Sequence, residues 1–508
     1  MKNQALQSAY DVVVVGAGIG GLTSGALLAK EGKRVLVVEQ EEHPGGFARE
    51  FRYGPYNINP AMHSIMGCNS TSSLGQGVID AVLNHLGVRN RCEFVAVDPF
   101  YRAQFPGFQM DVPTGRDAYL EAYQRHFPDE VEGLRDLVDL CSMIFREFMQ
   151  LPSVMRLHDW VLMPFRFPKL FYYANATLGS VMDRYLSDSQ MKSIYAILYP
   201  YLALPPARLS FILWAIMMAS AIEQGAFYCR GGFQNFADAL AEGIRVHGGE
   251  LILKARVSKI RAAGGRVQGV VLENGQEIAT PIVISNIDAR TTFQNILEAE
   301  QVPQSYLRKL IKLEISSSVL CLYLATDLDV HSLGIPKVTL VSPWDLEDAF
   351  AASIQGRVGG VAVHVPTVID PTLAPPGENL VVLQALISTE AADLSHTGRD
   401  QFVESLLDQA ETVLPDLRKH ITFVAGSSGK GQRDYHLHRL GPIYGWANPT
   451  KQAGPRRLPY KTPVSGLYFA GHWTQPGSGI WTVVLSGINA ARYVLEKNIT
   501  GAIWPLNF

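Results

Sequence analysis

Apolar residues along the chain fall into two patterns, short runs and longer stretches with helical spacing, which together predict an α/β protein. The first run, Val12 to Val15, is apolar at every position, which is typical of a parallel strand buried on both faces. Leu22 to Gly32 follows with a helical pattern, and Val35 to Glu39 predicts a second buried strand. The chain therefore opens with a strand, a turn, a helix and another strand.

The middle of the chain changes character twice. Helical patterns run from Val78 to about Ser220, interrupted by prolines and short strand-like runs. Beyond Gly231, an amphipathic helix and an alternating strand over Glu250 to Ile260 lead towards Asn274-Gly275, a strong hairpin signal. The other apolar runs predict strands at 266–273, 282–285, 319–325, 359–365, 380–387 and 467–470, and helices at 233–247, 399–413 and 483–495.

The turn after the first strand contains Gly16, Gly18 and Gly21 in the spacing G-x-G-x-x-G. Glycines here allow a tight turn and bring the N-terminus of the next helix up to a pyrophosphate. Glu39 ends the second strand at roughly the 20-residue distance where an adenosine ribose needs a hydrogen-bond acceptor. Because strand, turn, helix and acid occur in order, the sequence predicts a dinucleotide-binding unit.

Two more glycine-rich segments are expected to face the same ligand. Gly45 and Gly46 form a backbone-rich loop soon after the second strand. Near the other end, Gly471 follows an apolar strand, and Gly477 and Gly479 precede the last helix. Free N–H groups and the dipole of that helix would stabilise negative charge. Alternatively, the turn that contains Gly477 and Gly479 serves only to pack the last helix.

Composition excludes several classes of function. The 508 residues are 47% apolar and carry a formal charge of −3, with no Lys/Arg cluster interleaved with aromatics, so nucleic acid is not expected as a partner. The five cysteines are scattered without a C-x-x-C pair. This argues against a metal site or a disulfide framework and fits a reducing cytosol.

No signal peptide is recognisable at the N-terminus. The longest mainly apolar stretch, Leu209 to Ile222, is shorter than the roughly 18 residues that span a bilayer. It is expected to fill a core or to line an apolar tunnel.

With these motifs, most of the chain resembles the phytoene desaturase superfamily, which includes bacterial carotenoid desaturases, prolycopene isomerase and retinol saturase. Beyond the first turn, the resemblance rests on Gly225 to Leu240, Val257-Ser-Lys-Ile, Val283-Ile-Ser-Asn286 and Ala470 to Gly487. It implies a glutathione-reductase-like FAD-binding Rossmann domain with a discontinuous α+β substrate domain. By this resemblance, residues 8–75, 225–292 and 455–508 bind FAD, and residues 76–224 and 293–454 form the substrate domain.

The resemblance also assigns cofactor contacts. It places Gly16, Gly18, Gly21 and Glu39 at the adenosine and pyrophosphate, Gly45 and Gly46 over the phosphates, the Val257 backbone at the adenine, and Gly471, Gly479 and Ile480 at the flavin end. Two positions depart from the superfamily pattern. Phe47 stands where many relatives carry arginine or lysine, so Arg49 is expected to substitute. His472 stands where an acidic residue is common, which changes the expected ribitol contact.

The activity implied by the resemblance is an FAD-dependent oxidoreductase that acts on carbon–carbon double bonds of a long conjugated isoprenoid, as a desaturase, isomerase or saturase. His63, His472 and Trp481 are the candidates for the catalytic centre, because histidine titrates near neutrality and Trp481 lies just before the last predicted helix, at the flavin end. Each histidine could equally be structural. Two other readings stay open: an FAD-dependent amine or amino-acid oxidase, with Arg208 or Arg230 as a substrate clamp, and a non-catalytic prenyl-binding protein on the same fold.

Leu151 to Tyr173 mixes aromatic and basic residues, which is typical of a helix that dips into lipid headgroups but also of ordinary domain packing. A polyene gains about 20 kcal/mol on leaving water but almost nothing on leaving lipid, so such a substrate is best collected from a membrane. The sequence therefore predicts a cytoplasmic protein with peripheral membrane contact. It leaves the exact substrate, the direction of redox change, the electron partner and the oligomeric state open.

Overall fold

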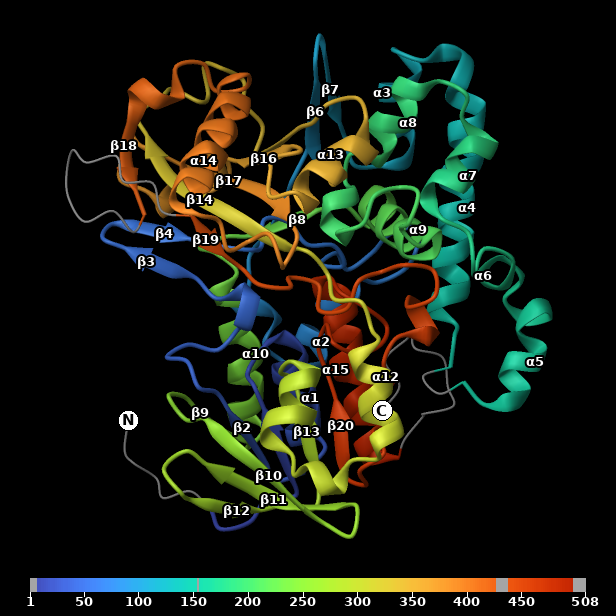
Figure 1. The fold of residues 1–508 in the computed structure, drawn as a ribbon, viewed down its shortest axis with the longest axis vertical. Coiled ribbons are helices and arrows are strands. Elements are labelled where there is room, and N and C mark those ends of the chain that lie inside the picture. The colour runs from blue at the N-terminus through green and yellow to red at the C-terminus, as the bar shows by residue number, and fades with distance from the viewer. Residues whose placement is uncertain (1–6, 153–154, 426–436, 497–508) are drawn as a thin grey trace.

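The computed structural model describes residues 7–152, 155–425 and 437–496. Figure 1 shows two layers of structure, one at the bottom of the view and one at the top, joined by several crossings of the chain. The chain starts in the lower layer, leaves it twice and ends there with its last strand and helix.

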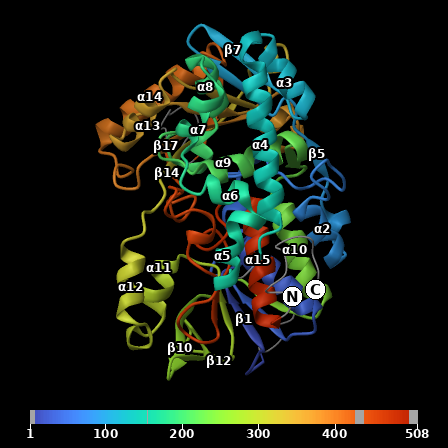
Figure 2. The same ribbon diagram turned by 90° about the vertical axis from the view of Figure 1, so that its right-hand side faces the viewer.

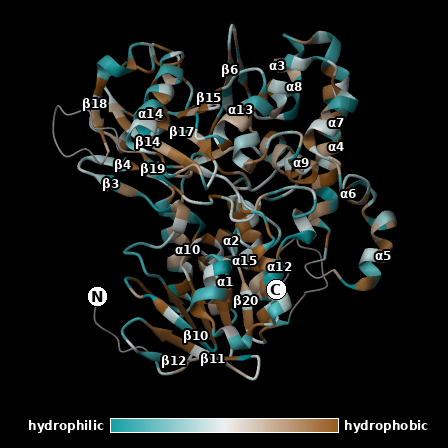
Figure 3. Ribbon diagram, in the orientation of Figure 1, coloured by the Kyte–Doolittle hydropathy of each residue, from teal (hydrophilic) through white to brown (hydrophobic). Residues whose placement is uncertain are grey.

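The lower layer is built on a parallel sheet in the order β20-β13-β1-β2-β9. Its strands are β1 (Val12–Val15), β2 (Val35–Val38), β9 (Glu250–Ile252), β13 (Val283–Ser285) and β20 (Leu467–Phe469). Both β1 and β2 are buried at every position, as their unbroken valine and leucine runs predict. Figure 3 colours these strands mostly as hydrophobic. The fold class predicted from the sequence is confirmed by this sheet and by the solved structures described below.

Three helices cover the sheet: α1 (Ile19–Lys30), α10 (Gln234–Val246) and α15 (Ile480–Leu495). The backbones of α1 and α15 approach closely, because a Cβ built on Gly487 would lie 2.6 Å from the carbonyl oxygen of Gly20. Both helices begin earlier than the hydrophobic pattern predicts, α1 at Ile19 and α15 at Ile480. Each glycine-rich turn therefore leads directly into a helix N-terminus.

The single strand predicted over Glu250 to Ile260 is wrong. The chain forms β9, turns at Lys254 with a φ of 55°, and starts β10 in a different sheet. Alternating side chains continue across the break, so the hydrophobic pattern alone could not reveal it. The second sheet is an antiparallel meander of β10 (Val257–Ala263), β11 (Arg266–Leu272) and β12 (Glu277–Ala279).

A larger sheet forms the upper layer, in the order β18-β14-β17-β16-β15-β6-β7, with β19 also paired to β14. Its strands are β6 (Tyr101–Phe105), β7 (Phe108–Val112), β14 (Ser318–Thr326), β15 (Val338–Val341), β16 (Val361–His364), β17 (Asn379–Ile387), β18 (Ile421–Val424) and β19 (His438–Arg439). Alternate residues of β14 serve two cores. Leu320, Leu322 and Leu324 pack in the core under α14 (His396–Glu411), whereas Cys321 and Tyr323 belong to the core that faces the lower layer.

Helices occupy one side of the upper layer, as Figure 2 shows for α4 and its neighbours. The remaining helices are α2 (Val78–Leu86), α3 (Arg116–Gln124), α4 (Val131–Met149), α5 (Leu157–Arg166), α6 (Pro168–Tyr172), α7 (Leu178–Tyr185), α8 (Ser189–Ala196), α9 (Phe211–Ala219), α11 (Ala289–Thr291), α12 (Gln304–Ile311) and α13 (Leu346–Ile354). The remaining strands are β3 (Phe51–Tyr53), β4 (Tyr56–Ile58), β5 (Phe94–Ala96) and β8 (Phe227–Cys229). Within the described ranges, no helix has both the length and the apolar character needed to cross a membrane.

Candidate functional site

A cavity of about 610 Å³ lies between the two layers. Its lower part is lined by the glycine-rich turns, and its upper part by apolar side chains from the helical region. Residues at both ends include Gly16, Gly18, Glu39, Gly45, Gly46, Arg49, His63, Leu198, Leu202, Leu213, Ile216, Met217, Asn286, Gly471, His472, Gly479, Ile480 and Trp481. The carboxyl ends of β1, β2, β13 and β20 open onto it, which is where ligands bind in parallel sheets of this kind.

Asn286 stands between the first glycine turn and the turn after β20. A Cβ on Gly18 would lie 2.6 Å from Asn286 Nδ2, and a Cβ on Gly471 would lie 2.6 Å from Asn286 Oδ1. Gly16 has a φ of 97°, a conformation that favours glycine. Asn286 Oδ1 is buried without a hydrogen-bond partner in the described part of the chain, so it is available to a ligand.

Glu39 is fixed at the end of β2 by backbone donors. The N–H of Ala17 donates to Glu39 Oε2 at 2.7 Å, and the N–H of Glu41 donates to Glu39 Oε1 at 3.0 Å. The residue is only 8% exposed, and its exposed part lines the cavity. Carboxylate oxygens can accept further hydrogen bonds, so the geometry suits a ribose hydroxyl.

The loop of Gly45 and Gly46 lies against the first glycine turn, since the N–H of Gly45 donates to Ala17 O at 2.7 Å. Arg49 lines the cavity, but its guanidinium already pairs with Glu41, Nη1 to Oε2, at 2.5 Å. Arg49 Nε is buried without a partner among the described residues. Arg49 therefore lies at the cavity, and its action on a phosphate stays a prediction.

At the other end of the glycine-lined region, α15 begins at the cavity. Gly479 precedes it with a φ of 101°, and Ile480 and Trp481 follow in the first turn. The positive end of the helix dipole therefore faces the cavity. Trp481 is 5% exposed, and its ring packs beside Phe145 at 5.8 Å between centroids.

His472 lines the cavity on a loop held by a buried arginine. Arg457 donates from Nη2 to the carbonyl oxygens of His472 at 2.7 Å and Tyr444 at 2.8 Å, and from Nη1 to Asn448 Oδ1 at 2.9 Å. Burial lowers the pKa of Arg457 to about 9. Burial and the nearby Arg457 charge lower the pKa of His472 to about 3, so this ring is neutral at physiological pH.

His63 belongs to a buried cluster that sequence analysis did not foresee. Its ring stacks on that of His364, with centroids 3.5 Å apart and an interplanar angle of 11°. Lys337, just before β15, donates from Nζ to His63 O and lies 3.5 Å from Ser64 Oγ. Gln384 of β17 lies beside both rings. Four segments thus bring this cluster to the cavity wall.

Burial sets the charge of this cluster. It lowers the pKa of His63 and that of His364 well below 6.5, with nearby Lys337 adding to both shifts. Burial also lowers the pKa of Lys337 to about 7. Both rings are therefore neutral at physiological pH, and the lysine sits close to its midpoint. The isolated lysine in the run Ile335-Pro-Lys337-Val-Thr339 was the one available sequence signal.

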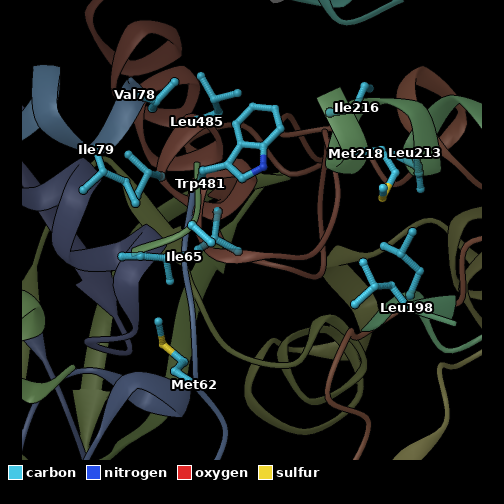
Figure 4. Packing of buried hydrophobic residues seen from close by; sticks show 14 of the residues in the cluster. Met62, Ile65, Val78, Ile79, Leu198, Leu213, Ile216, Met218, Trp481 and Leu485 are labelled. Atoms are coloured by element: carbon cyan, nitrogen blue, oxygen red, sulfur yellow. The ribbon is translucent and has the colours of Figure 1, made fainter. Parts of the chain in front are cut away.

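The upper part of the cavity is an apolar wall. Figure 4 shows Trp481 and Ile65 on one side, with Leu198, Leu213 and Ile216 across from them. The stretch Leu209 to Ile222 serves both roles considered for it, because α9 turns some side chains to the cavity and buries others in the core. Leu213, Ile216 and Met217 line the cavity, whereas Trp214 and Met218 are fully buried.

Some sequence-assigned residues lie away from this lining. Val257 stands at the start of β10, two residues after Ala255, whose N–H donates to Glu39 O at 2.9 Å. Its contact with an adenine stays a prediction. Arg208 and Arg230 pair with Glu314 and Glu93 at 2.7 and 2.8 Å, outside the cavity lining. The clamp considered for an amine or amino-acid substrate is therefore engaged elsewhere.

Large apolar side chains are exposed on α5 and α6, which lie beside α4 (Figure 2). They are Leu157 (82%), Trp160 (43%), Val161 (64%), Leu162 (41%), Phe165 (82%), Phe171 (53%) and Tyr172 (67%). Phe167, in the same segment, is 2% exposed. An apolar patch of this kind marks an interaction surface.

Comparison with known proteins gives a consistent result. The family model described as flavin containing amine oxidoreductase matches residues 19–495. Prolycopene isomerase 1, chloroplastic, of an Oncidium hybrid cultivar is 28% identical, covering 96% of this chain and 84% of its own. The all-trans-retinol 13,14-reductase of Homo sapiens is 24% identical over 91% and 82% of the two chains. The 4,4'-diapophytoene desaturase (4,4'-diapolycopene-forming) of Methylomonas sp. is 24% identical over 96% and 95%.

Solved structures share the fold. An oxidoreductase from Methanosarcina mazei superposes with a TM-score of 0.63 at 20% identity, covering 96% of this chain and 100% of its own. Cyclohexylamine oxidase from Brevibacterium oxydans gives a TM-score of 0.62 at 16% identity, with 96% and 99% covered. The chain thus shares its overall fold with these two solved structures.

Proposed function

The chain belongs to the flavin containing amine oxidoreductase family, and from this premise we propose that it acts on carbon–carbon double bonds of a long apolar isoprenoid. The cavity carries this proposal, because its lower end suits a dinucleotide and its upper end offers hydrocarbon to a substrate. The resemblance to the phytoene desaturase superfamily is confirmed by the relatives, whose names are those of an isomerase, a reductase and a desaturase.

FAD is the cofactor, and the lower cavity fits it. Gly16, Gly18 and the loop of Gly45 would hold the pyrophosphate, Glu39 the ribose, and Gly479 with Ile480 the flavin end. Asn286 Oδ1 is an unused buried acceptor between these regions. When bound, FAD supplies hydride exchange with a carbon atom.

His63 is the side chain that we propose exchanges a proton with the substrate. Nε2 of its ring is buried without a hydrogen-bond partner among the described residues, and burial disfavours the protonated ring, so a proton taken up there is readily released. The stack with His364 fixes the plane of the ring. His472 and Trp481 would shape the reacting centre, the first as a neutral ring and the second as an apolar wall.

An amine or amino-acid oxidase would need a charged clamp for its substrate. Besides Arg208 and Arg230, the cavity-lining Arg439 is also engaged, with Asp393 at 2.7 Å. Apolar residues dominate the wall opposite Trp481. The geometry therefore favours a polyene, which has no charge to clamp.

The test of this function is direct. Purified FAD-loaded protein is mixed anaerobically with carotenoid precursors, in the oxidised and in the prereduced state, and the polyenes are separated by chromatography. We expect a polyene to be desaturated, saturated or isomerised in one of the two states. Rapid flavin bleaching by amines, with no polyene altered, would replace this proposal by the oxidase. A protein that purifies without FAD and only binds prenyl chains would support the non-catalytic alternative.

The exposed patch on α5 and α6 is proposed to contact a membrane. Its aromatic and aliphatic side chains stand beside Arg166 and Lys169, an arrangement that suits lipid headgroups above acyl chains. A protein held there can take an apolar substrate directly from lipid, which avoids exposing the substrate to water.

Liposome co-sedimentation tests the membrane contact. Leu157, Phe165 and Phe171 replaced by serine should reduce binding and leave the flavin spectrum unchanged. Phe167 is left intact because it is buried. Ile311→Ser and Ile354→Ser are matched controls, since these residues are exposed on α12 and α13, outside the patch. If the wild type does not bind liposomes, the patch has another role.

A further inference from the structure

A second cavity, of about 80 Å³, adjoins the upper end of the first. Four residues line both cavities: Ala61, Tyr201, Ile443 and Tyr444. Beyond them, the second cavity runs between α13 and strands β15, β16 and β17. These four residues therefore lie between the two spaces.

The two tyrosines come from different parts of the chain. Tyr201 lies in the short turn of helix over Tyr199–Leu202, and Tyr444 lies in the loop anchored by Arg457. Both tyrosines line both cavities, and burial raises the pKa of both phenols. The backbone of Tyr444 is held on both sides, because its N–H donates to Ser316 Oγ at 3.1 Å and its carbonyl oxygen accepts from Arg457 at 2.8 Å. The side chain of Tyr444 can therefore rotate while its backbone stays in place.

The second cavity offers hydrocarbon to a ligand. Its walls include Ile197, Leu340, Val361, Ala362 and Leu386. Three polar side chains in the lining already have partners: Ser342 Oγ donates to Pro343 O at 3.0 Å, Ser353 Oγ to Phe350 O at 2.7 Å, and Gln384 Nε2 to Pro60 O at 2.9 Å. The other polar side chains of the lining are the phenols of Tyr199, Tyr201 and Tyr444, whose rings add apolar surface, so the cavity suits the hydrocarbon end of a ligand.

We propose that the second cavity is a subsite for one apolar end of the substrate, and that Tyr201 and Tyr444 form the partition that this end must pass. The inference rests on the proposed function and adds a determinant of substrate length. A shorter polyene ends at the partition. A longer one rotates the tyrosines and places its end among Leu340, Val361 and Ala362.

The test compares two polyenes of different length, all-trans-retinol and lycopene, binding to the FAD-loaded protein. Binding is followed by quenching of tryptophan fluorescence. Ala362→Leu fills the second cavity with hydrocarbon from β16, and Ala362 does not line the first cavity. Lycopene affinity should fall roughly tenfold or more, because a misplaced methylene in an apolar site changes binding by about 10- to 200-fold. Retinol affinity should stay unchanged. Ala351→Leu, on the exposed face of α13, is the matched control and should affect neither ligand.

Tyr444→Ala gives a second, independent measurement. Removing the ring opens the partition and should raise lycopene affinity relative to retinol, whereas Tyr444→Phe keeps the ring and the wild-type ratio. Flavin content and unfolding temperature show that each variant is folded. An Ala362→Leu protein that loses both ligands equally, or neither, overturns the inference, as does an unchanged ratio in Tyr444→Ala. A wild type that binds neither polyene contradicts the proposed function itself.

Discussion

The carboxylate of Glu39 has two functions. Its oxygens hold the N–H groups of Ala17 and Glu41, which shapes the glycine turn, and the same carboxylate borders the cavity. A ligand hydroxyl at this point would meet an acceptor that backbone donors have already oriented, so little side-chain freedom is lost on binding.

Replacing Glu39 by alanine should therefore weaken FAD binding. A hydrogen bond to a charged group contributes about 1.5–3 kcal/mol, so affinity should fall roughly ten- to a hundredfold. The measurement is the recovery of free flavin fluorescence on dilution. Glu42→Ala is the control, because Glu42 is exposed and forms a salt bridge with Lys254. Equal affinities in wild type and Glu39→Ala would place the ribose elsewhere.

A second prediction for a single residue concerns Lys337. Its pKa is about 7 in the folded protein and near 10.5 when unfolded, so the unfolded chain binds more protons between these values. The stability of the wild type should thus rise from about pH 7 to pH 10, by an amount on the order of 5 kcal/mol at most. Lys337→Met removes this titration. Urea unfolding at pH 7 and pH 9 should show a smaller gain in the variant, and parallel gains would contradict the buried lysine.

The residues around Glu39 and His63 show which parts of the site could be predicted from the sequence. Glu39 and the glycines of the first turn were predicted because the whole signal lies within one strand-turn-helix unit. The partners of His63 were not, since His364 and Gln384 lie on two strands, and Lys337 just before a third, of a sheet whose register no local pattern specifies. The role of Arg457 was also not predicted, because the loops that bring its carbonyl partners together leave no pattern in the sequence.

At the scale of elements, the crossing of α1 and α15 is a close backbone contact. A methyl group on Gly487 would lie 2.6 Å from Gly20 O and 2.7 Å from Thr23 Cβ, so both helices approach through their backbones. The same helices begin at the two turns that border the cavity. Their separation therefore sets the distance between those turns.

Gly487→Ala should consequently act on stability and on cofactor binding together. On an exposed helix, alanine would be favoured over glycine by about 1 kcal/mol. Here overpacking should dominate and destabilise the protein by roughly 1–3 kcal/mol, with weaker FAD retention. Thermal unfolding and flavin release measure the two effects. Gly243→Ala in α10 is the control, because its new methyl would meet the flexible end of Leu86 at 3.2 Å. A stabilised Gly487→Ala would show that the helices can separate freely.

The predicted strands at 266–273, 319–325 and 380–387 agree with β11, β14 and β17 to within one residue at each end, whereas β15 and β18 were not predicted. The prediction was wrong at Glu250 to Ile260, where Lys254 in a left-handed conformation moves the chain from one sheet to another without disturbing the alternation. Both helix starts at the glycine turns were placed three residues late. In α1 the first turn contains Gly20 and Gly21, which carry no apolar signal.

Across the whole molecule, burial keeps His63, His364 and His472 neutral. Their folded pKa values lie below the unfolded value near 6.5, so unfolding takes up protons as pH falls. Stability should decline below about pH 6.5, with each histidine adding roughly 1.4 kcal/mol per pH unit at most. Denaturant titrations at pH 7, 6 and 5 should show this slope, and His472→Gln should reduce it. A slope that His472→Gln leaves unchanged would mean that this ring is protonated in the folded protein.

The anchoring of two loops by Arg457 has a consequence for evolution and for engineering. The same guanidinium holds the carbonyls of Tyr444, at the partition, and of His472, at the flavin end. A change that displaces Arg457 would disturb both places at once, so changes in the two loops should be strongly epistatic. Variation in substrate range is then expected to accumulate in side chains such as Tyr444 and Ala362, while the lengths of the two loops stay constant.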